Sequence, residues 1–403
     1  MKVLRGLKFF LILSTSFPVI ILSQVRCGTD AYHSQYLRQN EVAAEAWNTL
    51  NQLNISSLEI RSELDIPVVV HIVYRTEEQN LSESDILDQL DIVNVALNSS
   101  NKTHPGVPTE FKPLATAMKI RLCLSEEMPG GSNTLRITRQ KTDILDLGDY
   151  RKQDIKFSTK GGVDAWDTKK YLNIWIGEVG NNILGYSTFP DMAGNPEDGI
   201  VLDVRYLLGQ TPSYNLSRTL IHELGHYLGL CHLPGCLHAG CEVDDNIKDT
   251  PNQSHYYNSS ECPTWPQISC NSIDMYMNYM SLAPDDCLLM FTAEQVKLAR
   301  FLLSIKRNEL LGRTCPDIGS TQTWSNGLKV YYSGDEGAVI ISSPHAAPDE
   351  WKVQLINMAG QIMFESPISY RKRLIIEREL AQGNYIVYFY GPGNNFYKKI
   401  TLY

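Results

Sequence analysis

The segment that decides the fold and the chemistry of this chain reads Thr219-Leu220-Ile221-His222-Glu223-Leu224-Gly225-His226-Tyr227-Leu228-Gly229-Leu230-Cys231-His232. His222 and His226 are four residues apart, so on a helix they share one face and both imidazoles can reach one ion. Gly229 allows the helix to stop and the chain to turn sharply, which returns His232 as a third nitrogen ligand. The pattern predicts a zinc-binding helix that ends in a tight turn.

Three protein ligands leave the fourth tetrahedral position of zinc open for water, which is typical of a catalytic rather than a structural site. Glu223 follows the first ligand and is placed to take a proton from that water and pass it to the leaving amine. The alternative is a core helix with satisfied histidines. The glycine and the third histidine disfavour it, because they make a chance match on the order of a thousandfold rarer than His-Glu-x-x-His alone.

A methionine-rich segment, Asp274-Met275-Tyr276-Met277-Asn278-Tyr279-Met280, lies about fifty residues further on. Peptidases of the metzincin class carry, after such a zinc helix, a methionine in a tight turn beneath the metal. These methionines could be ordinary core residues, but their position after the zinc helix favours the Met-turn. We therefore expect a zinc-dependent endopeptidase that hydrolyses internal peptide bonds of proteins.

The N-terminus is typical of an export signal. A basic start with Lys2, Arg5 and Lys8 precedes an apolar run at residues 9–22, and Ser23 offers a cleavage site. The run is short for a membrane span and contains a proline, so a removable signal peptide is favoured over a membrane anchor. No later stretch approaches a spanning length, so we expect a secreted or cell-surface protein without a membrane span.

Length and charge limit the remaining possibilities. The chain has 403 residues, which is more than one hydrophobic core usually carries. We expect a signal peptide (1–23), a pro-segment (24–64), a peptidase domain (65–316) and a C-terminal β-domain (320–403). The net charge of −9 at pH 7 and the pI near 5.5 argue against nucleic acid or an anionic membrane as partner.

Residue patterns predict an α/β arrangement for the peptidase domain. Apolar and β-branched runs predict strands at 66–74, 118–124, 171–176, 185–190 and 199–204. Helical spacing behind a capping residue predicts helices at 82–97 and 292–311. Before residue 65 the chain is polar, with a weakly helical stretch at 41–53 and no strand pattern.

The C-terminal region changes character. Beyond residue 320 the pattern is one of short alternating strands separated by turn residues, without a helix, which predicts a small all-β sandwich. The expected strands are 328–332, 338–342, 351–357, 373–377, 384–390 and 397–402.

The nine cysteines are unevenly spread, with six between Cys231 and Cys287 and only Cys27, Cys123 and Cys315 outside that window. In an exported chain this clustering indicates disulfide bonds that staple a loop-rich region. The odd number leaves at least one thiol over.

Several further phrases follow a common pattern: Gly161-Gly162-Val163-Asp164-Ala165-Trp166, Tyr171-Leu172-Asn173-Ile174-Trp175, Asp198-Gly199-Ile200-Val201, Cys241-Glu242-Val243-Asp244-Asp245, Asp249-Thr250-Pro251, Met277-Asn278-Tyr279-Met280, Asp285-Asp286-Cys287 and Phe291-Thr292. With them the chain resembles the pappalysin family, specifically its bacterial cytophagalysin branch, from roughly Cys27 to Leu311. The resemblance implies a metzincin catalytic domain with a twisted five-stranded sheet, an active-site helix and a backing helix. It also implies zinc, structural calcium, and Met280 as the Met-turn residue.

Spacing and the resemblance together imply the disulfides Cys241–Cys270 and Cys262–Cys287, which would tie the loop after the zinc helix to the Met-turn region. Cys123–Cys315 and Cys231–Cys236 are further expected pairs. For calcium, the segment offers hard oxygen ligands on Asp244, Asp245, Asp249 and Thr250. The alternative is a solvated acidic loop.

The chain departs from the family at the Met-turn. Family members usually read Met-Asp-Tyr there, with the tyrosine aiding the transition state, whereas this chain has Ser281 and Leu282 after Met280. Loss of one such donor typically raises the barrier by about 2.7–4 kcal/mol, unless Tyr279 or another group substitutes. We expect a weaker enzyme. The rival hypothesis is a catalytically silent surface-binding protein that kept the zinc fold.

Asp286 lies in the segment that shapes the S1′ pocket in this family. A carboxylate there would favour arginine or lysine on the prime side of the cleaved bond. Asp286 could equally be a calcium ligand or face solvent.

Arg26-Cys27-Gly28-Thr29 matches the pro-segment phrase of this family. The Cys27 thiolate could occupy the open position of the zinc and keep the precursor latent. A disulfide at Cys27 is the competing interpretation. We expect the activating cut near Arg61, before the first strand.

The C-terminal region resembles the type A sorting domains of the type IX secretion system. The resemblance rests on Val353-Gln354-Leu355-Ile356-Asn357-Met358-Ala359-Gly360-Gln361, Leu380-Ala381-Gln382-Gly383-Asn384-Tyr385 and Lys398-Lys399-Ile400. It implies the secretion machinery as a partner. A carbohydrate- or protein-binding sandwich is the alternative.

Overall fold

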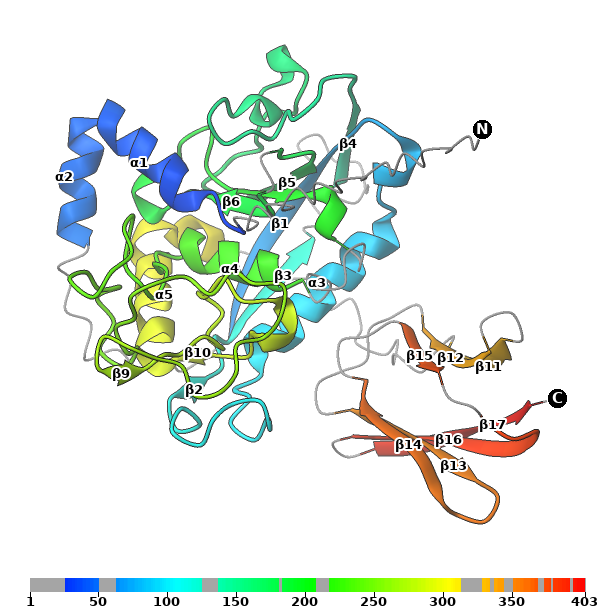
Figure 1. Ribbon diagram of the computed structural model, residues 1–403. Helices are drawn as coiled ribbons and strands as arrows, with labels where there is room; N and C mark the ends of the chain where they lie inside the picture. Colours follow the sequence, from blue (N-terminus) through cyan, green and yellow to red (C-terminus); the bar gives the residue numbers. More distant parts are fainter. Residues whose placement is uncertain are drawn as a thin grey trace, which may run out of the picture.

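The computed structural model describes residues 26–50, 63–124, 137–180, 183–207, 217–312, 328–333, 337–343, 351–368, 373–377, 380–391 and 394–402. Up to residue 312 these form a mixed α/β unit around a parallel-rich sheet (Figure 1). Residues 1–25, which include the predicted signal peptide, and the predicted cut near Arg61 lie outside the described residues.

The central sheet is built on β1 (Leu64–Tyr74), whose long apolar run is buried along most of its length. One side of β1 pairs in parallel with β5 (Leu172–Gly177), which pairs in parallel with β7 (Ile200–Asp203). The edge strand β6 (Gly185–Ser187) is antiparallel to β7. Strands buried on both faces read as continuous hydrophobic runs, which is why the sequence pattern could predict them.

The sheet has six strands, so the expectation of five was wrong. Both β3 (Ile120–Leu124) and β4 (Ile137–Lys141) pair in parallel with β1 on its other side, one after the other along its length. The physical reason is that β1 has 11 residues, enough for two strands of five residues to share it. β4 is polar and partly exposed, so no apolar pattern indicated it.

Three long helices pack against the sheet and share its main hydrophobic core: α3 (Glu83–Asn98), α4 (Arg218–Tyr227) and α5 (Ala293–Lys306). The predicted capping boxes begin two of them. Ser82 accepts a hydrogen bond from the backbone of Asp85 before α3, and Thr292 does the same for Gln295 before α5. The single-turn helix Asn308–Gly312 follows α5 and completes the predicted segment 292–311.

The N-terminal segment is more helical than the sequence indicated. It forms α1 (Thr29–Gln39) and α2 (Glu41–Leu50), and only the second was expected. Figure 1 shows α1 beginning beside β6, at the edge of the central sheet, with α2 packed on α1 farther from the sheet. The start of the predicted pro-segment therefore lies close to the helix that carries the predicted ligands.

Shorter elements complete this unit. The two-residue strands are β2 (Ala115–Thr116), β8 (Ile268–Ser269), β9 (Ser272–Ile273) and β10 (Phe291–Thr292). Single-turn 3-10 helices lie at Glu77–Gln79, Asp154–Lys156, Ser158–Lys160, Pro190–Met192, Val204–Tyr206 and Asp285–Cys287.

Three disulfides staple the loops that follow α4. Cys241 is bonded to Cys270 and Cys262 to Cys287, the two pairings that the family resemblance implied. Cys231 is bonded to Cys236, directly after the end of α4. Cys123 is also disulfide-bonded, and its expected partner Cys315 lies outside the described residues.

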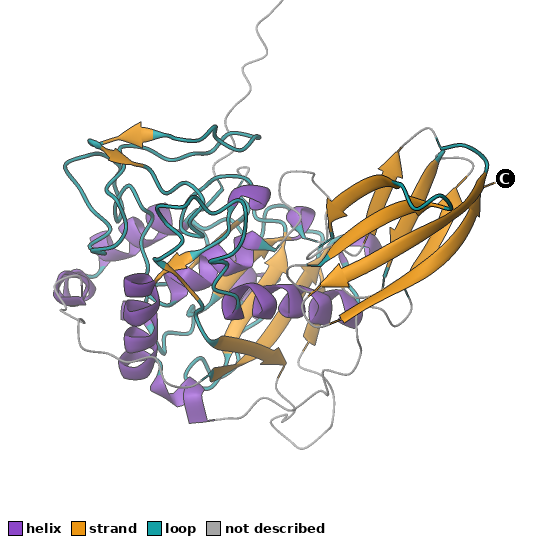
Figure 2. Ribbon diagram, turned by 90° about the horizontal axis from the view of Figure 1, so that it is seen from below, coloured by secondary structure: helices purple, strands orange, loops and turns teal. Residues whose placement is uncertain are grey.

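The C-terminal residues form two antiparallel sheets that share one hydrophobic core, separate from that of the α/β unit. Figure 2 shows these strands without any helix among them. The first sheet contains β11 (Lys329–Ser333), β12 (Ala338–Ser342) and β15 (Arg373–Glu377). The second contains β14 (Ile362–Pro367), β13 (Lys352–Asn357), β16 (Gly383–Gly391) and β17 (Asn394–Leu402). β14 was not expected, because its residues are largely exposed and show no clear alternation.

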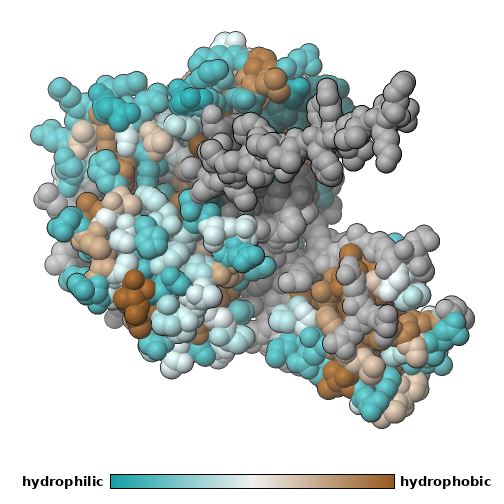
Figure 3. All heavy atoms as spheres, viewed as in Figure 1, coloured by the Kyte–Doolittle hydropathy of each residue, from teal (hydrophilic) through white to brown (hydrophobic). Residues whose placement is uncertain are grey.

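No helix within the described ranges is long and apolar enough to cross a membrane. The face seen in Figure 3 is largely hydrophilic over the α/β unit, with hydrophobic residues in small separate areas.

One close contact positions α4 over the Met-turn. A Cβ atom built on Gly225, in the middle of α4, would lie 2.3 Å from the sulfur of Met280. Met280 is fully buried in the main core. Glycine is therefore required on this face of the helix, although glycine inside a helix is intrinsically unfavourable.

We expect Gly225→Ala to lower the free energy of unfolding by about 1–3 kcal/mol, because the methyl group and the Met280 side chain would compete for one space. Urea unfolding of the unmodified protein, Gly225→Ala, Met280→Ala and the double variant measures the change in the free energy of unfolding. In a Met280→Ala background, Gly225→Ala should lower the free energy of unfolding clearly less. An equal decrease in both backgrounds would contradict the steric explanation.

Candidate metal centre

The three predicted histidine ligands converge at the end of α4. His222 and His226 share one face of the helix, and His232 returns to them after the turn at Gly229. Gly229 has a φ of +95°, and a Cβ there would lie 2.3 Å from a methyl carbon of Leu302. Both the backbone conformation and the packing against α5 thus require glycine at the turn.

The geometry of the nitrogen atoms fits a tetrahedral zinc ion. The Nε2 atom of His222 lies 3.1 Å from that of His226 and 3.1 Å from that of His232, and the third separation is 3.2 Å. Ligands at the usual zinc–nitrogen distance of 2.0–2.1 Å would stand about 3.3 Å apart. All three side chains are buried, and a bound cation accounts for three imidazoles that point at one position.

Electrostatics keep these ligands in the form that binds metal. Burial is the main cause that lowers the pKa of His226 to about 3 and the pKa of His222 well below its ordinary value of 6.5. The neighbouring histidines act in the same direction. Neutral imidazoles with a free Nε2 lone pair are the species that coordinate zinc.

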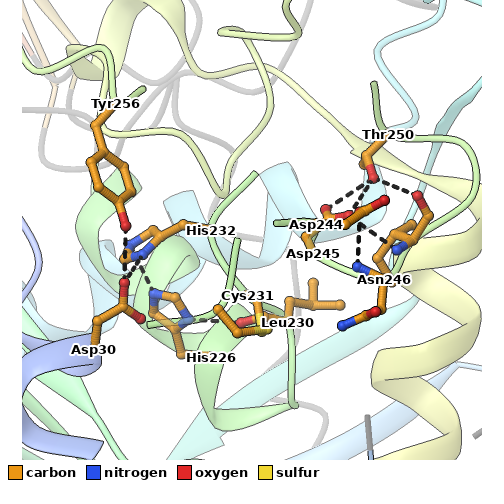
Figure 4. Close-up of a disulfide and its surroundings, with 12 residues drawn as sticks. Asp30, His226, Leu230, Cys231, His232, Asp244, Asp245, Asn246, Thr250 and Tyr256 are labelled. Atoms are coloured by element: carbon orange, nitrogen blue, oxygen red, sulfur yellow. Dashed lines mark hydrogen bonds and ion pairs between the residues drawn. A yellow bond between two sulfur atoms is a disulfide. The ribbon is translucent and has the colours of Figure 1, made fainter. Parts of the chain in front are cut away.

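Each ligand is oriented through its other ring nitrogen. The Nδ1 of His222 lies 2.7 Å from the backbone oxygen of Tyr279, and that of His226 lies 2.7 Å from the backbone oxygen of Leu230. The Nδ1 of His232 lies 2.8 Å from Oδ2 of Asp30, a side chain of α1 (Figure 4). Such partners fix the tautomer so that Nε2 faces the metal.

Glu223 is completely buried beside the ligands. Its Oε2 accepts a hydrogen bond of 2.8 Å from the hydroxyl of Thr29 in the pro-segment. Burial raises the pKa of Glu223 to about 7, although hydrogen bonds from Thr29 and Cys27 act in the opposite direction. A carboxyl group that titrates near neutrality can both accept and return a proton.

Cys27 joins the three histidines. Its Sγ lies 3.5 Å from Nε2 of His226, and the four ligand atoms are all within 4.8 Å of one another. A tetrahedral zinc with one thiolate ligand would give a sulfur–nitrogen distance of about 3.5 Å. Cys27 is the free cysteine of the described residues, so the competing disulfide interpretation does not hold there.

The backbone around Cys27 extends the edge of the central sheet. The backbone nitrogen of Gly28 donates to Gly185 of β6 at 2.9 Å, and Leu184 donates to the oxygen of Arg26 at 2.9 Å. Cys27 and Gly185 form a parallel bridge. The predicted pro-segment thus occupies the strand edge that runs past the candidate metal centre.

The structure separates Asp286, the residue predicted to shape the S1′ pocket, from its neighbour Asp285. Asp286 is exposed, whereas Asp285 is buried and forms an ion pair with Arg26, with Oδ1 and Nη2 2.8 Å apart. The backbone nitrogen of Arg218 donates to the other carboxylate oxygen at 3.2 Å. The reason is the 3-10 turn at Asp285–Cys287, which points successive side chains about 120° apart.

The structure places the two Met-turn residues on which the missing tyrosine bears, Leu282 and Tyr279, in the interior. Leu282 is buried, and the ring of Tyr279 lies under the guanidinium of Arg218 at 5.4 Å. A different tyrosine, Tyr256, lies at the site and donates from its hydroxyl to Asp30 at 3.2 Å. Tyr256 belongs to a loop without any motif, so no sequence pattern indicated it.

The acidic loop is only partly assembled as expected. The Thr250 hydroxyl lies 2.8 and 2.9 Å from the two carboxylate oxygens of Asp245, and Asp244 lies beside them (Figure 4). The Asp249 carboxylate is engaged elsewhere, because it accepts from Thr292 at 2.6 Å and from the backbone nitrogen of Glu294 at 3.0 Å. Asp249 thus stabilises the N-terminus of α5, where a negative charge is favourable.

Known proteins resemble this chain over the same region. Residues 156–303 match the peptidase M43 family model described as pregnancy-associated plasma protein-A. An extracellular metalloprotease of Podospora anserina is 35% identical over 154 residues, which cover 35% of this chain and 50% of that relative. An extracellular metalloprotease of Arthroderma benhamiae is 34% identical over 259 residues, covering 62% of this chain and 81% of the relative.

Among solved structures, a promirolysin mutant of Tannerella forsythia matches with a TM-score of 0.63 and 31% identity, over 71% of this chain and 97% of that one. The chain spans about half the length of the Podospora relative, but most of the length of the other two. The family implies a metal, and the cluster of histidines is where this chain can hold it. The chain belongs to the pappalysin family of metalloproteases, peptidase family M43.

Proposed function

We propose that this protein is a secreted, zinc-dependent endopeptidase that is made as a latent precursor. The observation that carries the proposal is the convergence of His222, His226 and His232 within 3.2 Å of one another, with Glu223 buried beside them. The relatives named extracellular metalloproteases support the reaction class and the export. Within the family we place the chain in the cytophagalysin branch, on the sequence phrases that resemble that branch.

The proposed roles follow from the chemistry of the side chains. When bound, zinc supplies Lewis-acid polarisation of the peptide carbonyl and lowers the pKa of water. Glu223 accepts the proton of the attacking water at its carboxylate and returns it to the leaving amine. Glu223 lies on the same helix as the ligands His222 and His226, which places its carboxylate beside the proposed zinc position. Leu282 offers no hydroxyl to the transition state, so a modest turnover is expected.

We expect Glu223→Ala to lower cleavage of a denatured protein substrate by about 100- to 10,000-fold, since a general base contributes that much to a rate. A zinc chelator should abolish the activity of the unmodified enzyme. The zinc content of Glu223→Ala should stay at one ion per chain, and an exposed carboxylate, Glu261, provides the control variant Glu261→Ala. Absence of any chelator-sensitive turnover would favour the silent binding protein.

Latency is proposed because the pro-segment occupies three parts of the site at once. Cys27 takes the ligand position next to the histidines, and Thr29 holds the proposed base Glu223 through its hydroxyl. Arg26 fills the space beside Asp285. A substrate cannot bind until these groups leave, and a cut between α2 and β1 would release them without disturbing the sheet. The name promirolysin of a structural relative fits a precursor form.

A Cys27→Ala precursor should become active faster than the unmodified precursor, because the thiolate no longer competes for the metal. The time course of activity after addition of an activating protease measures the change. A Gln39→Ala precursor is the control, because Gln39 is exposed at the end of α1. Equal activation times for the Cys27→Ala and unmodified precursors would contradict the thiol switch.

Asp285 is proposed as the specificity residue in place of Asp286. After the pro-segment leaves, its buried carboxylate loses the Arg26 guanidinium and is left without that cation. Loss of one cation from a buried ion pair is unfavourable, so a substrate arginine or lysine on the prime side that replaced the Arg26 guanidinium would be favoured.

In a cleavage-site profile by mass spectrometry, Asp285→Asn should reduce the preference for a basic prime-side residue by at least about 30-fold, since losing one partner of a buried charge pair costs about 2 kcal/mol or more. Asp286→Asn is the matched control, because it makes the same change on the exposed neighbour and should leave the profile unaltered. A basic preference that survives in Asp285→Asn would exclude the assignment.

Calcium is proposed to bind the acidic loop through Asp244, Asp245 and Thr250. Burial, and next the hydrogen bond with Asp244, raise the pKa of Asp245 well above 3.8. Two carboxyl groups in contact are unfavourable when both are ionised, and a hard cation between them removes the repulsion. A solvated acidic loop remains the alternative, although burial of Asp245 and Thr250 argues against it.

Calcium should raise the thermal stability of metal-stripped protein reloaded with zinc, and more at pH 8 than at pH 5. Without calcium, the raised pKa of Asp245 makes the folded chain bind more protons than the unfolded chain just above pH 3.8, so stability falls as the pH rises through that window. Calcium requires the ionised form and therefore acts best above the folded pKa. Asp245→Asn should lose the effect. An unchanged melting temperature on adding calcium would favour the solvated loop.

The domain boundaries and the roles of the two terminal regions are also proposals. We propose residues 1–23 as signal peptide, 24–64 as pro-segment, 65–316 as peptidase domain and 320–403 as a β-sandwich that addresses the protein to a type IX secretion machinery. The two antiparallel sheets with one shared core support the last assignment. A secretion assay of a chain truncated after residue 316 tests it.

A further inference from the structure

The three ligand histidines differ in where their outer partners come from. His222 and His226 are oriented by backbone oxygens, those of Tyr279 and Leu230, which belong to the peptidase domain itself. His232 alone is oriented by a side chain, and that side chain is Asp30 of the pro-segment. Activation therefore leaves two of these contacts intact and removes the third.

The contact between Asp30 and His232 is built into the structure. The two atoms are 2.8 Å apart, and the side chains are 18% and 2% exposed. The ring of Tyr256 packs edge-on against the imidazole of His232, with centroids 5.3 Å apart, and its hydroxyl donates to the same Asp30 oxygen at 3.2 Å. Figure 4 shows the side chains of Asp30 and Tyr256 meeting at the ring of His232.

A carboxylate that accepts from the far nitrogen of a metal-bound histidine makes the near nitrogen more basic. Loss of such an outer partner typically costs about 10- to 100-fold in metal affinity. Hydrogen bonds to an ionised acceptor are also roughly twice as strong as those between neutral groups. Asp30 therefore increases the metal affinity of the site more than a neutral hydrogen-bond acceptor in its place would.

We infer that Asp30 is a positioning residue of the metal centre that the chain possesses only while its pro-segment is attached, so that the precursor holds zinc more tightly than the active enzyme. This inference rests on the proposed zinc site and zymogen. The pro-segment then has a second task besides blocking the site, which is to secure the metal before activation.

The same contacts predict the state of the site after activation. When Asp30 departs, the Nδ1–H of His232 loses its acceptor and the Tyr256 hydroxyl loses the acceptor that it shared. The hydroxyl oxygen of Tyr256 can then accept from His232. A neutral phenol then replaces a carboxylate as the hydrogen-bond acceptor. The orientation of the His232 imidazole is kept, but the metal affinity of the site falls.

The test measures zinc affinity by competition with a chelator, in full-length precursor that also carries Glu223→Ala so that it cannot cut itself. Asp30→Asn should weaken zinc binding by about 10- to 100-fold. Glu41→Gln removes an exposed carboxylate from the same segment and should change nothing. Because no hydrolysis is measured, failure of this inference is distinct from failure of the proposed activity.

A second measurement separates positioning from simple docking of the pro-segment. In cobalt-substituted precursor, the thiolate-to-cobalt absorption band reports whether Cys27 still lies at the metal. Weaker metal binding with the band retained supports the inference. Unchanged zinc affinity in Asp30→Asn with the band retained overturns it.

A third measurement needs no substitution in the pro-segment, and it decides the case if Asp30→Asn loses the cobalt band. Nitrogen NMR of the imidazoles in the zinc-loaded Glu223→Ala chain should show the His232 Nδ1–H signal moving when an added protease removes the pro-segment. The Nδ1–H signals of His222 and His226 should move less, because their acceptors on Tyr279 and Leu230 remain and only the shared fourth ligand Cys27 is lost. A His232 signal that is the same before and after removal would overturn the inference.

Discussion

The structure depends on one geometric constraint, which is that three buried imidazole nitrogens must stand about 3.2 Å apart around one position. A helix supplies two of them through its own periodicity. The third can arrive only if the helix ends within one turn, so the backbone must adopt a positive φ at Gly229. The Cys231–Cys236 disulfide, the Leu302 contact and Met280 beneath Gly225 then hold this turn in place.

The predicted pro-segment supplies partners to buried polar groups of the site. Arg26 forms an ion pair with Asp285, Thr29 donates to one carboxylate oxygen of Glu223, and Asp30 contacts Nδ1 of His232. Each of these partners in the peptidase domain is buried, so each would be costly to leave unpaired in a dry site. The active enzyme must therefore fill the same positions in other ways, with water, with substrate groups or with a neighbouring side chain such as Tyr256.

The proposed latency, specificity and metal retention all depend on a single short segment. Residues 26–28 extend the edge of the sheet at β6 and Thr29 begins α1; within residues 26–30 lie the contacts to the predicted ligands, to the proposed base and to Asp285. The helices α1 and α2 that follow add apolar contacts and hydrogen bonds, including Trp47 against Phe189 and a buried hydrogen bond of 3.0 Å between His33 and Asp191. Docking of the segment therefore also depends on contacts well outside the metal centre.

The sequence by itself determined the parts of this protein that rest on local rules. Helical periodicity, a glycine at a turn and capping boxes indicated α4, its ligands, α3 and α5, and long apolar runs indicated β1 and β5. Only the tertiary structure decided which carboxylate of Asp285 and Asp286 turns inward, that β4 shares β1 with β3, and that Asp30 reaches His232. These features join residues far apart in the chain or depend on the direction of one turn, and no periodic pattern records either.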